Sequence, residues 1–313
     1  TMLATMSTEE TTIDCQGTKC VLHKWEASTD SPLGVCVVYH GFLAHGKYPT
    51  VRYAAELLSS NNYTVIAVDL PGHGKSPGLR GYLPGADELI ATGAAVAEYG
   101  AKLCCNADDD EVPLLPLFLV GSSMGGTIAL AVATELSEAS SSPSALAGKA
   151  LKGVLLLAPM LELDVATPLR YILYGLASTP ILSTTPLIPS SATSAEKQYR
   201  DADKLKECED DPLTVDTGGK LRPASASTCV ELANGIMGER FDQVTVPFLC
   251  MVAKEDVVVK NAGSYRLMEE AASTDKTLKE YDALHGLLCE PPPLINEIHA
   301  DLMMWVNERA GGQ

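Results

Sequence analysis

The chain has 313 residues, a length that suits one α/β domain with an inserted subdomain. Its 40 acidic and 23 basic side chains leave a formal net charge of −17, which repels phosphate backbones and anionic lipid surfaces, so we expect no nucleic-acid partner. A hydrophobic fraction of 46% with 20% charged residues is typical of a globular protein that buries a sizeable core.

A hairpin is predicted close to the start of the chain. Residues 1–12 are polar and acidic and lack the basic segment and apolar run of a secretory signal peptide. Residues 11–14 and 19–26 alternate in character on either side of a turn, which indicates an antiparallel hairpin at a sheet edge. Cys15 and Cys20 flank this turn and could face each other, but we expect two unpaired thiols.

Short apolar runs rich in Val, Ile and Leu then alternate with helical patterns, which is typical of a parallel sheet with crossover helices. The runs are 33–39, 63–69, 114–120, 151–158, 246–253 and 277–281, and the helical segments are 49–61, 86–101, 124–139, 262–272 and 294–309. Polar stretches at 106–111 and 137–144 are predicted to be loop tips. With the hairpin, these elements predict an α/β fold with a mostly parallel, eight-stranded sheet flanked by helices.

The alternation breaks at residue 159, and an intervening segment continues to residue 242. This segment is too long for a loop and contains amphipathic pieces at 169–177 and 226–238. We therefore expect a mostly helical cap at 159–242, inserted between two parts of the core, 1–158 and 243–313.

The most apolar part of the predicted cap, 168–190, is interrupted by Arg170, Pro180, Pro186 and Pro189, which argues against a membrane-spanning helix. Burial against the core and weak apolar contact with a membrane both remain open for it. The nine cysteines include no CxxC pair, so they indicate neither a disulfide framework nor a zinc site and favour a reducing compartment. We expect a cytoplasmic protein, with peripheral membrane contact left open.

One serine has the surroundings of a nucleophile. Ser123 is the third residue of Gly121-Ser122-Ser123-Met124-Gly125-Gly126, which follows a predicted strand and precedes a predicted helix. A serine at such a sharp turn needs small neighbours, because a Cβ at 121 or 125 would collide with the adjacent strand and helix. The turn lifts the hydroxyl above the sheet and directs the helix N-terminus at a developing oxyanion, which indicates an α/β-hydrolase.

Two other serines compete with Ser123. Ser76 lies in Gly74-Lys75-Ser76-Pro77-Gly78, which has the same spelling. No strand runs directly into Gly74, and Pro77 disfavours a helix start at Ser76. Ser122 lacks the glycine on either side at the required spacing. We therefore predict Ser123 as the nucleophile.

A serine hydroxyl needs a base, and a histidine can serve at neutral pH. In this fold the order along the chain is nucleophile, acid, histidine, so His285 and His299 are the candidates. His285 follows the last predicted strand, where ligands collect in open α/β sheets, whereas His299 lies within the C-terminal helix. We predict His285 as the base.

The acid that orients the imidazole is expected on the loop after the preceding strand. Asp256 stands there, and its neighbour Glu255 is the main rival. Asp282 is a weaker rival, because it lies three residues before His285 on the same turn. We predict Asp256 as the acid.

The end of the predicted strand 33–39 should complete the oxyanion hole. We expect the backbone amides of Phe42 and Met124 to donate to the oxyanion. His40 is expected to hold this turn, and His45 is left open between lining the pocket and capping the turn. No third metal ligand with suitable spacing accompanies these histidines, so we predict neither a metal site nor a cofactor.

Together these motifs resemble the monoacylglycerol lipase family, particularly its plant and algal members, over nearly the whole chain except the far N-terminus and much of the cap. The matching stretches are His40-Gly41, Asp69 to Ser76 with Gly78-Leu79, Gly121 to Gly126, Leu157 to Met160, Val246 to Leu249, Ser273 to Lys279 and His285 to Leu287. The resemblance implies that Ser123, Asp256 and His285 form the triad, that Phe42 and Met124 form the oxyanion hole, and that the cap is a lid whose apolar mouth admits one acyl chain.

Ser122, Phe42 and the cap depart from the family pattern, which bears on the substrate rather than on the chemistry. The function expected is a serine hydrolase that forms an acyl-enzyme and releases fatty acid and glycerol from a monoacylglycerol. A lysophospholipase or an esterase of phenolic esters such as caffeoylshikimate is the alternative, since the family contains both. A non-catalytic lipid-binding receptor is the alternative of another class. The expected partner is a small lipid ester, and the sequence does not specify an oligomeric state.

Overall fold

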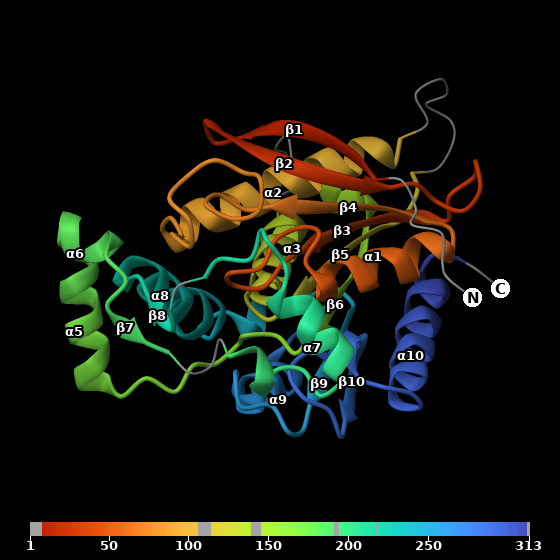
Figure 1. The fold of residues 1–313 in the computed structure, drawn as a ribbon. Helices are drawn as coiled ribbons and strands as arrows, with labels where there is room; N and C mark the ends of the chain where they lie inside the picture. The colour runs from red at the N-terminus through yellow and green to blue at the C-terminus, as the bar shows by residue number, and fades with distance from the viewer. Residues whose placement is uncertain (1–7, 106–113, 139–144, 191–193, 217, 312–313) are drawn as a thin grey trace.

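The central element of the computed structural model is an eight-stranded sheet (Figure 1). The structure describes residues 8–105, 114–138, 145–190, 194–216 and 218–311. Within them the strand order is β1-β2-β4-β3-β5-β6-β9-β10. The strands are β1 Glu9–Cys15, β2 Thr18–Trp25, β3 Gly34–Tyr39, β4 Tyr63–Asp69, β5 Leu117–Ser122, β6 Leu151–Leu157, β9 Phe248–Ala253 and β10 Lys276–Tyr281.

The predicted fold class is confirmed. The pairs β1–β2 and β2–β4 are antiparallel, and all other pairs in this sheet are parallel. The strands β3, β4 and β9 are buried along their whole length, because helices cover both faces of the sheet. Cys15 and Cys20 are buried and unbonded, as expected for two free thiols.

Two strands begin two or three residues later than predicted, and proline explains both starts. β5 begins at Leu117 and β9 at Phe248, directly after Pro116 and Pro247. Proline has no N–H to donate to a ladder, but its carbonyl can still accept. The oxygens of Pro116 and Pro247 accept hydrogen bonds from Val35 N at 2.8 Å and from Val154 N at 3.0 Å.

Helices cover the two faces of the sheet and bury a separate apolar cluster on each. The core helices are α1 Pro49–Ser60, α2 Ala86–Leu103, α3 Met124–Glu138, α4 Ala145–Ala150, α9 Asn261–Glu270 and α10 Leu294–Arg309. Side chains of α2, α3 and α9 join one cluster, and side chains of α1 and α10 join the other. The short helix α4 was not predicted. The predicted loop tip 106–111 and residues 139–144 of the second tip lie outside the described residues.

Small helices and one short strand pair stand between β6 and β9. They are α5 Thr167–Ala177, α6 Pro180–Thr184, β7 Ile188–Pro189, η1 Ala195–Lys197, α7 Ala202–Glu209, β8 Lys220–Leu221, α8 Pro223–Val230, the π-helical η2 Glu231–Met237 and η3 Phe241–Gln243. Figure 1 shows α5 and α6 at the end of the molecule opposite α10. The 3-10 turn η4 Leu287–Cys289 follows β10. The boundaries of a cap at 159 and 242 stay a prediction. Among the described helices, none combines the length and apolarity needed to cross a bilayer.

Candidate active site

Ser123 occupies a strained turn between β5 and α3. Its φ of 54° is in the left-handed region, which a residue with a Cβ seldom adopts. Backbone hydrogen bonds hold it there, because Ser123 N donates to Leu157 O at 3.0 Å. Its carbonyl accepts from Gly126 N at 2.9 Å and from Met160 N at 3.0 Å. Hydrogen bonds to the end of β6, to Met160 beyond it and to α3 therefore hold the turn in place.

Glycines make this turn sterically possible. A Cβ on Gly121 would lie 2.1 Å from the Gly125 carbonyl oxygen, and a Cβ on Gly125 would lie 2.1 Å from that of Tyr39. A Cβ on Gly41 would lie 3.3 Å from the Ser123 Cβ, so the end of β3 also passes directly beside the serine. Strand, helix and neighbouring strand approach one another as the sequence motif predicts.

His285 and Asp256 meet on adjacent loops. β9 and β10 are parallel neighbours, so the loops that follow them leave the same edge of the sheet. Nδ1 of His285 lies 2.7 Å from Oδ2 of Asp256, and both side chains are buried. The other carboxylate oxygen accepts from the N–H groups of Val258 at 2.8 Å and Val259 at 3.1 Å. The carboxylate thus anchors its own loop with one oxygen and orients the imidazole with the other.

The rival acids are engaged elsewhere. Glu255 pairs with Arg200 at 2.8 Å, and Asp282 pairs with Lys254 at 3.1 Å. Both carboxylates are largely exposed, and neither forms a hydrogen bond with His285 among the described residues. The structure therefore brings together His285 and Asp256, the pair chosen from the sequence.

Ser76, the serine with the same motif spelling, uses its hydroxyl for backbone contacts. It donates to Asp69 O at 2.5 Å and accepts from Val21 N at 2.8 Å. Because both interactions tie the end of β4 to β2, this hydroxyl is occupied in holding the sheet edge. His299, the rival base, lies on α10, where partial burial lowers its pKa.

The histidines near the predicted oxyanion hole fix backbone turns. His40 Nε2 accepts from Leu70 N at 3.1 Å, and its Nδ1 donates to Gly41 O at 2.7 Å. His45 Nδ1 accepts from Lys47 N at 3.1 Å, and its Nε2 lies 2.9 Å from Asp211 Oδ1. His40 thus has the structural contacts expected of it, and His45 caps its turn. Within the described residues no group of three or more His, Cys, Asp or Glu side chains is placed to hold a metal ion.

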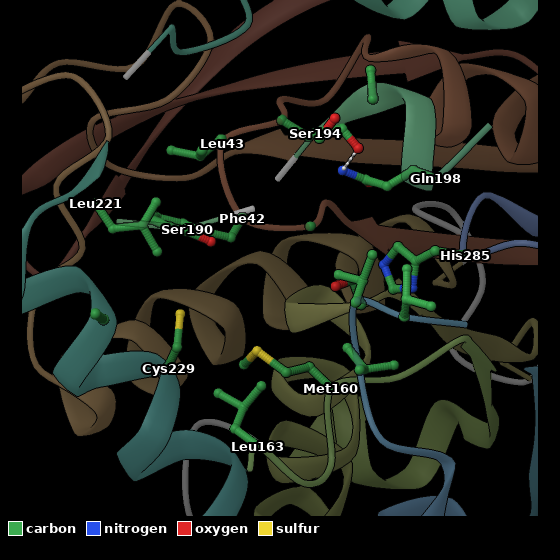
Figure 2. A pocket seen from close by; sticks show the side chains of 18 of the residues that line it. Phe42, Leu43, Met160, Leu163, Ser190, Ser194, Gln198, Leu221, Cys229 and His285 are labelled. Carbon is green, nitrogen blue, oxygen red and sulfur yellow. Dashed lines mark hydrogen bonds between the residues drawn. The ribbon is translucent and has the colours of Figure 1, made fainter. Parts of the chain in front are cut away.

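Ser123, Asp256 and His285 all line one cavity of about 1050 Å³. The predicted oxyanion residues lie beside it: Phe42 contributes to the lining, and Met124 is buried at the first position of α3. Figure 2 shows His285 across the cavity from Leu163, Leu221 and Cys229. The segment between β6 and β9 supplies most of the apolar wall, including Leu163, Leu169, Ile172, Leu173, Ile188, Leu221, Cys229 and Val230.

Two features of the site were not found from the sequence. One is an acidic lining, formed by Glu162, Asp164, Glu209, Asp211 and Asp216, with Lys260 as a basic residue among the described lining side chains. The other is the close contact of residues 198–200 with the His285 loop, where Gly286 N donates to Gln198 O. The glycine after His285 was the available signal for that contact, because glycine often marks a close approach of backbone.

The chain matches the family model described as serine aminopeptidase, S33, over residues 30–292. Human monoglyceride lipase is 30% identical over 90% of this chain and 84% of that protein. The monoacylglycerol lipase of Mycolicibacterium smegmatis is 27% identical over 97% of this chain and 99% of that protein. Caffeoylshikimate esterase of Arabidopsis thaliana is 30% identical over 80% of this chain and 71% of that protein. A solved soluble variant of the Saccharomyces cerevisiae monoglyceride lipase shares the fold, with a TM-score of 0.78 at 19% identity over 96% of each chain.

Fold and site together define an α/β-hydrolase, with a mostly parallel sheet and a serine at the strand-to-helix turn. The chain belongs to the monoacylglycerol lipase family within the serine aminopeptidase S33 group of these proteins, and it is a carboxylic ester hydrolase. The family resemblance and the enzyme class predicted from the sequence are confirmed.

Buried histidines beneath the site predict a loss of stability in acid. Burial lowers the pKa of His73 to about 4, and His73 Nε2 is buried without a hydrogen-bond partner among the described residues. Burial also lowers the pKa of His40 well below its usual value. The unfolded chain, with a histidine pKa of ~6.5, therefore binds more protons than the folded chain below that pH. The free energy of unfolding should fall as the pH drops from ~6.5 toward 4.

Urea unfolding of wild type and His73→Phe at pH 7.5, 6.0 and 5.0 measures this contribution. The phenyl ring keeps the contacts of His73 with His40 and Phe42 but does not titrate. Each such histidine adds a slope of about 1.4 kcal/mol per pH unit between its two pKa values. The variant should lose that share of the slope below pH 6, while the carboxylate contribution stays common to both proteins. Parallel curves for the two proteins would contradict the assignment.

Proposed function

We propose that this ester hydrolase is a monoacylglycerol lipase in which Ser123 is the nucleophile, His285 the general base and Asp256 the residue that orients it. The observation that carries the proposal is the 2.7 Å contact between His285 Nδ1 and Asp256 Oδ2 on a cavity that Ser123 also lines. With Nδ1 held by the carboxylate, Nε2 is the ring nitrogen that can take a proton from the serine.

The steps follow the acyl-enzyme route. His285 removes the proton of Ser123 as its oxygen attacks the ester carbonyl, and the backbone amides of Phe42 and Met124 stabilise the oxyanion. His285 then protonates the departing alcohol, which leaves the acyl group on Ser123. A water molecule, activated by the same imidazole, releases the fatty acid.

The cavity favours a long acyl chain joined to a neutral alcohol. Apolar side chains of the proposed cap, 159–242, form much of the wall of a cavity of about 1050 Å³, which suits an acyl chain. Besides Asp256, five carboxylates line the same cavity, with Lys260 as a basic counterpart among the described lining residues. This negative field disfavours substrates that carry a carboxylate or a net phosphate charge, since like charges in a partly desolvated cleft repel.

The negative charge of the cavity lining also distinguishes the alternative substrates. Shikimate is a carboxylate, so the acidic lining speaks against caffeoylshikimate, the substrate in the name of the Arabidopsis relative. Glycerol is neutral, and the human and mycobacterial relatives bear the name of monoacylglycerol lipases. A zwitterionic lysophospholipid remains the alternative substrate. A receptor without catalysis remains the alternative of another class, and the engaged His285 and Asp256 pair speaks for an enzyme.

Exposed apolar side chains surround the cavity mouth. Tyr171 is 73%, Ile172 59% and Ile181 79% exposed, all on α5 or α6. Leu169 and Ile172 also line the cavity, so its wall continues onto the surface. We propose that this apolar face of α5 and α6 makes weak contact with lipid, driven by apolar burial because the chain carries a net charge of −17.

The triad assignment predicts that Ser123→Ala lowers kcat by on the order of 10⁶ on any ester that the wild type cleaves, because it removes the proposed nucleophile. Ser76→Ala is the matched control: it should lower stability by ~1–3 kcal/mol, because Val21 N loses its acceptor, and keep kcat. Steady-state kinetics and labelling by a fluorophosphonate probe measure both. Near-wild-type turnover by Ser123→Ala would refute the nucleophile, and a folded wild type that binds lipid without labelling would favour the receptor.

The substrate assignment predicts an order of kcat/KM: a monoacylglycerol first, then a lysophosphatidylcholine of the same chain length, then caffeoylshikimate. Glu162→Gln and Asp216→Asn together should raise kcat/KM for the anionic ester and leave the neutral ester within about twofold, because removing like charge relieves repulsion only for an anion. Asp203→Asn with Asp210→Asn, two acids of the same segment outside the cavity lining, is the control of equal charge. Caffeoylshikimate as the preferred substrate would overturn the assignment.

The membrane contact predicts that the protein pellets with phosphatidylcholine vesicles and that Tyr171→Ser with Ile181→Ser weakens pelleting severalfold, because ~25 cal/mol is lost per Å² of apolar area kept in water. Met304→Ser is the control, since Met304 is 53% exposed on α10, at the opposite end of the molecule. Equal pelleting of all three proteins, or no pelleting of the wild type, would remove the contact.

A further inference from the structure

A short stretch of the cap lies directly on the loop that carries His285. Gly286 N donates to Gln198 O at 2.9 Å, and a Cβ on Gly286 would lie 2.5 Å from the ring of Tyr199. The contact is so close that no other residue fits at position 286 without displacing the cap. Figure 2 shows Gln198 beside His285 at the edge of the cavity. The position of the His285 loop is therefore set in part by the cap.

A buried carboxylate holds the same loop from the other side. Oε1 of Glu290 accepts from Leu284 N, the amide just before His285, at 2.6 Å. Its Oε2 lies 3.5 Å from Nε of Arg200, and the Glu290 side chain is 2% exposed. A buried carboxylate is costly unless it is paired and hydrogen-bonded. Oε1 has its hydrogen bond, whereas Oε2 has no hydrogen-bond partner among the described residues and faces the nearby guanidinium as an ion pair.

Arg200 connects the loops of the base and of the acid. Besides Glu290, it donates through Nη2 to Glu255 Oε1 at 2.8 Å, and Glu255 immediately precedes Asp256. The hydrogen bond that Arg200 donates to Glu255 raises the pKa of Arg200, so the guanidinium stays charged. The backbones of the two loops are also joined, because Glu255 N donates to Ala283 O at 3.1 Å. One cap residue thus bridges the two loops that present the proposed base and acid.

We infer that Glu290 is a positioning residue for ester hydrolysis, acting through Leu284 N and, with Arg200, setting where His285 and Asp256 stand relative to Ser123. The inference rests on the proposed catalytic role of His285. Proton transfer depends steeply on distance, and a displacement of ~1 Å at the reacting groups costs on the order of 10²-fold in rate. Glu290 touches no reacting atom in this scheme, so its contribution belongs to kcat rather than to substrate binding.

Three variants separate the contacts. Glu290→Ala removes both the acceptor for Leu284 N and the charge that faces Arg200, whereas Glu290→Gln keeps an acceptor oxygen of the same reach. Glu290→Ala should lower kcat by on the order of 10²-fold and leave KM within about twofold, and Glu290→Gln should recover kcat to within ~10-fold of wild type. Arg200→Gln should also lower kcat, and Lys206→Gln, which removes an exposed positive charge from the same segment, should not.

The measurements are kcat and KM on a short-chain p-nitrophenyl ester, the rate of fluorophosphonate labelling, and the thermal unfolding midpoint. A folded Glu290→Ala with wild-type kcat, or one whose loss lies in KM alone, would overturn the inference. If Glu290→Ala does not fold, Arg200→Gln decides it, because wild-type kcat in that folded variant contradicts positioning through the Arg200–Glu290 pair. His285→Ala is the reference: if it keeps activity, the proposed base is wrong, whereas an inactive His285→Ala beside a fully active Glu290→Ala refutes the positioning role alone.

Discussion

The site depends on how closely three pieces of backbone approach one another at the end of β5. Strand β5, helix α3 and the end of β3 meet where a Cβ on Gly121 or Gly125 would lie 2.1 Å from a carbonyl oxygen. Without side chains there, the chain can turn sharply enough to hold Ser123 at a φ of 54°. The loops that carry Asp256 and His285 follow β9 and β10, which run parallel to β5. They therefore leave the sheet at the same end as the Ser123 turn.

The segment between β6 and β9 takes part in the site in two distinct ways. Its apolar side chains line the cavity, and its residues 198–200 contact the loops of His285 and Asp256. A wall can be rebuilt with other apolar residues at small cost, because apolar packing is not directional. The ion pairs and the Gly286 contact depend on geometry, so a movement of residues 198–200 would alter the position of His285, the proposed base, as well as the cavity wall.

Most of the sheet could be predicted from the sequence, because each buried parallel strand is a continuous apolar run. The strand starts at Leu117 and Phe248 were missed by two or three residues, since periodicity does not register that Pro116 and Pro247 lack a donor. The glycine frame and the loop after each strand are local signals, so Ser123, Asp256 and His285 could be chosen from the sequence as candidates, and the structure brings His285 and Asp256 within 2.7 Å. The bridge from Arg200 to Glu255 spans 55 residues and leaves no local pattern, so only the fold reveals it.

The chemistry is easier to infer than the substrate, because the turn at Ser123 and the cavity wall are constrained by different physical effects. A side chain at Gly121 or Gly125 would collide with backbone, so the turn at Ser123 requires glycine there. This requirement makes the turn recognisable in the sequence as a motif. Apolar recognition discriminates weakly, since one methylene in a pocket is worth only ~1–3 kcal/mol. Charge discriminates more sharply, because a carboxylate lining penalises any anion that must shed water to enter. Under the proposed function, the sign of the cavity lining is therefore the feature that separates neutral from anionic esters, more than the shape of the apolar wall.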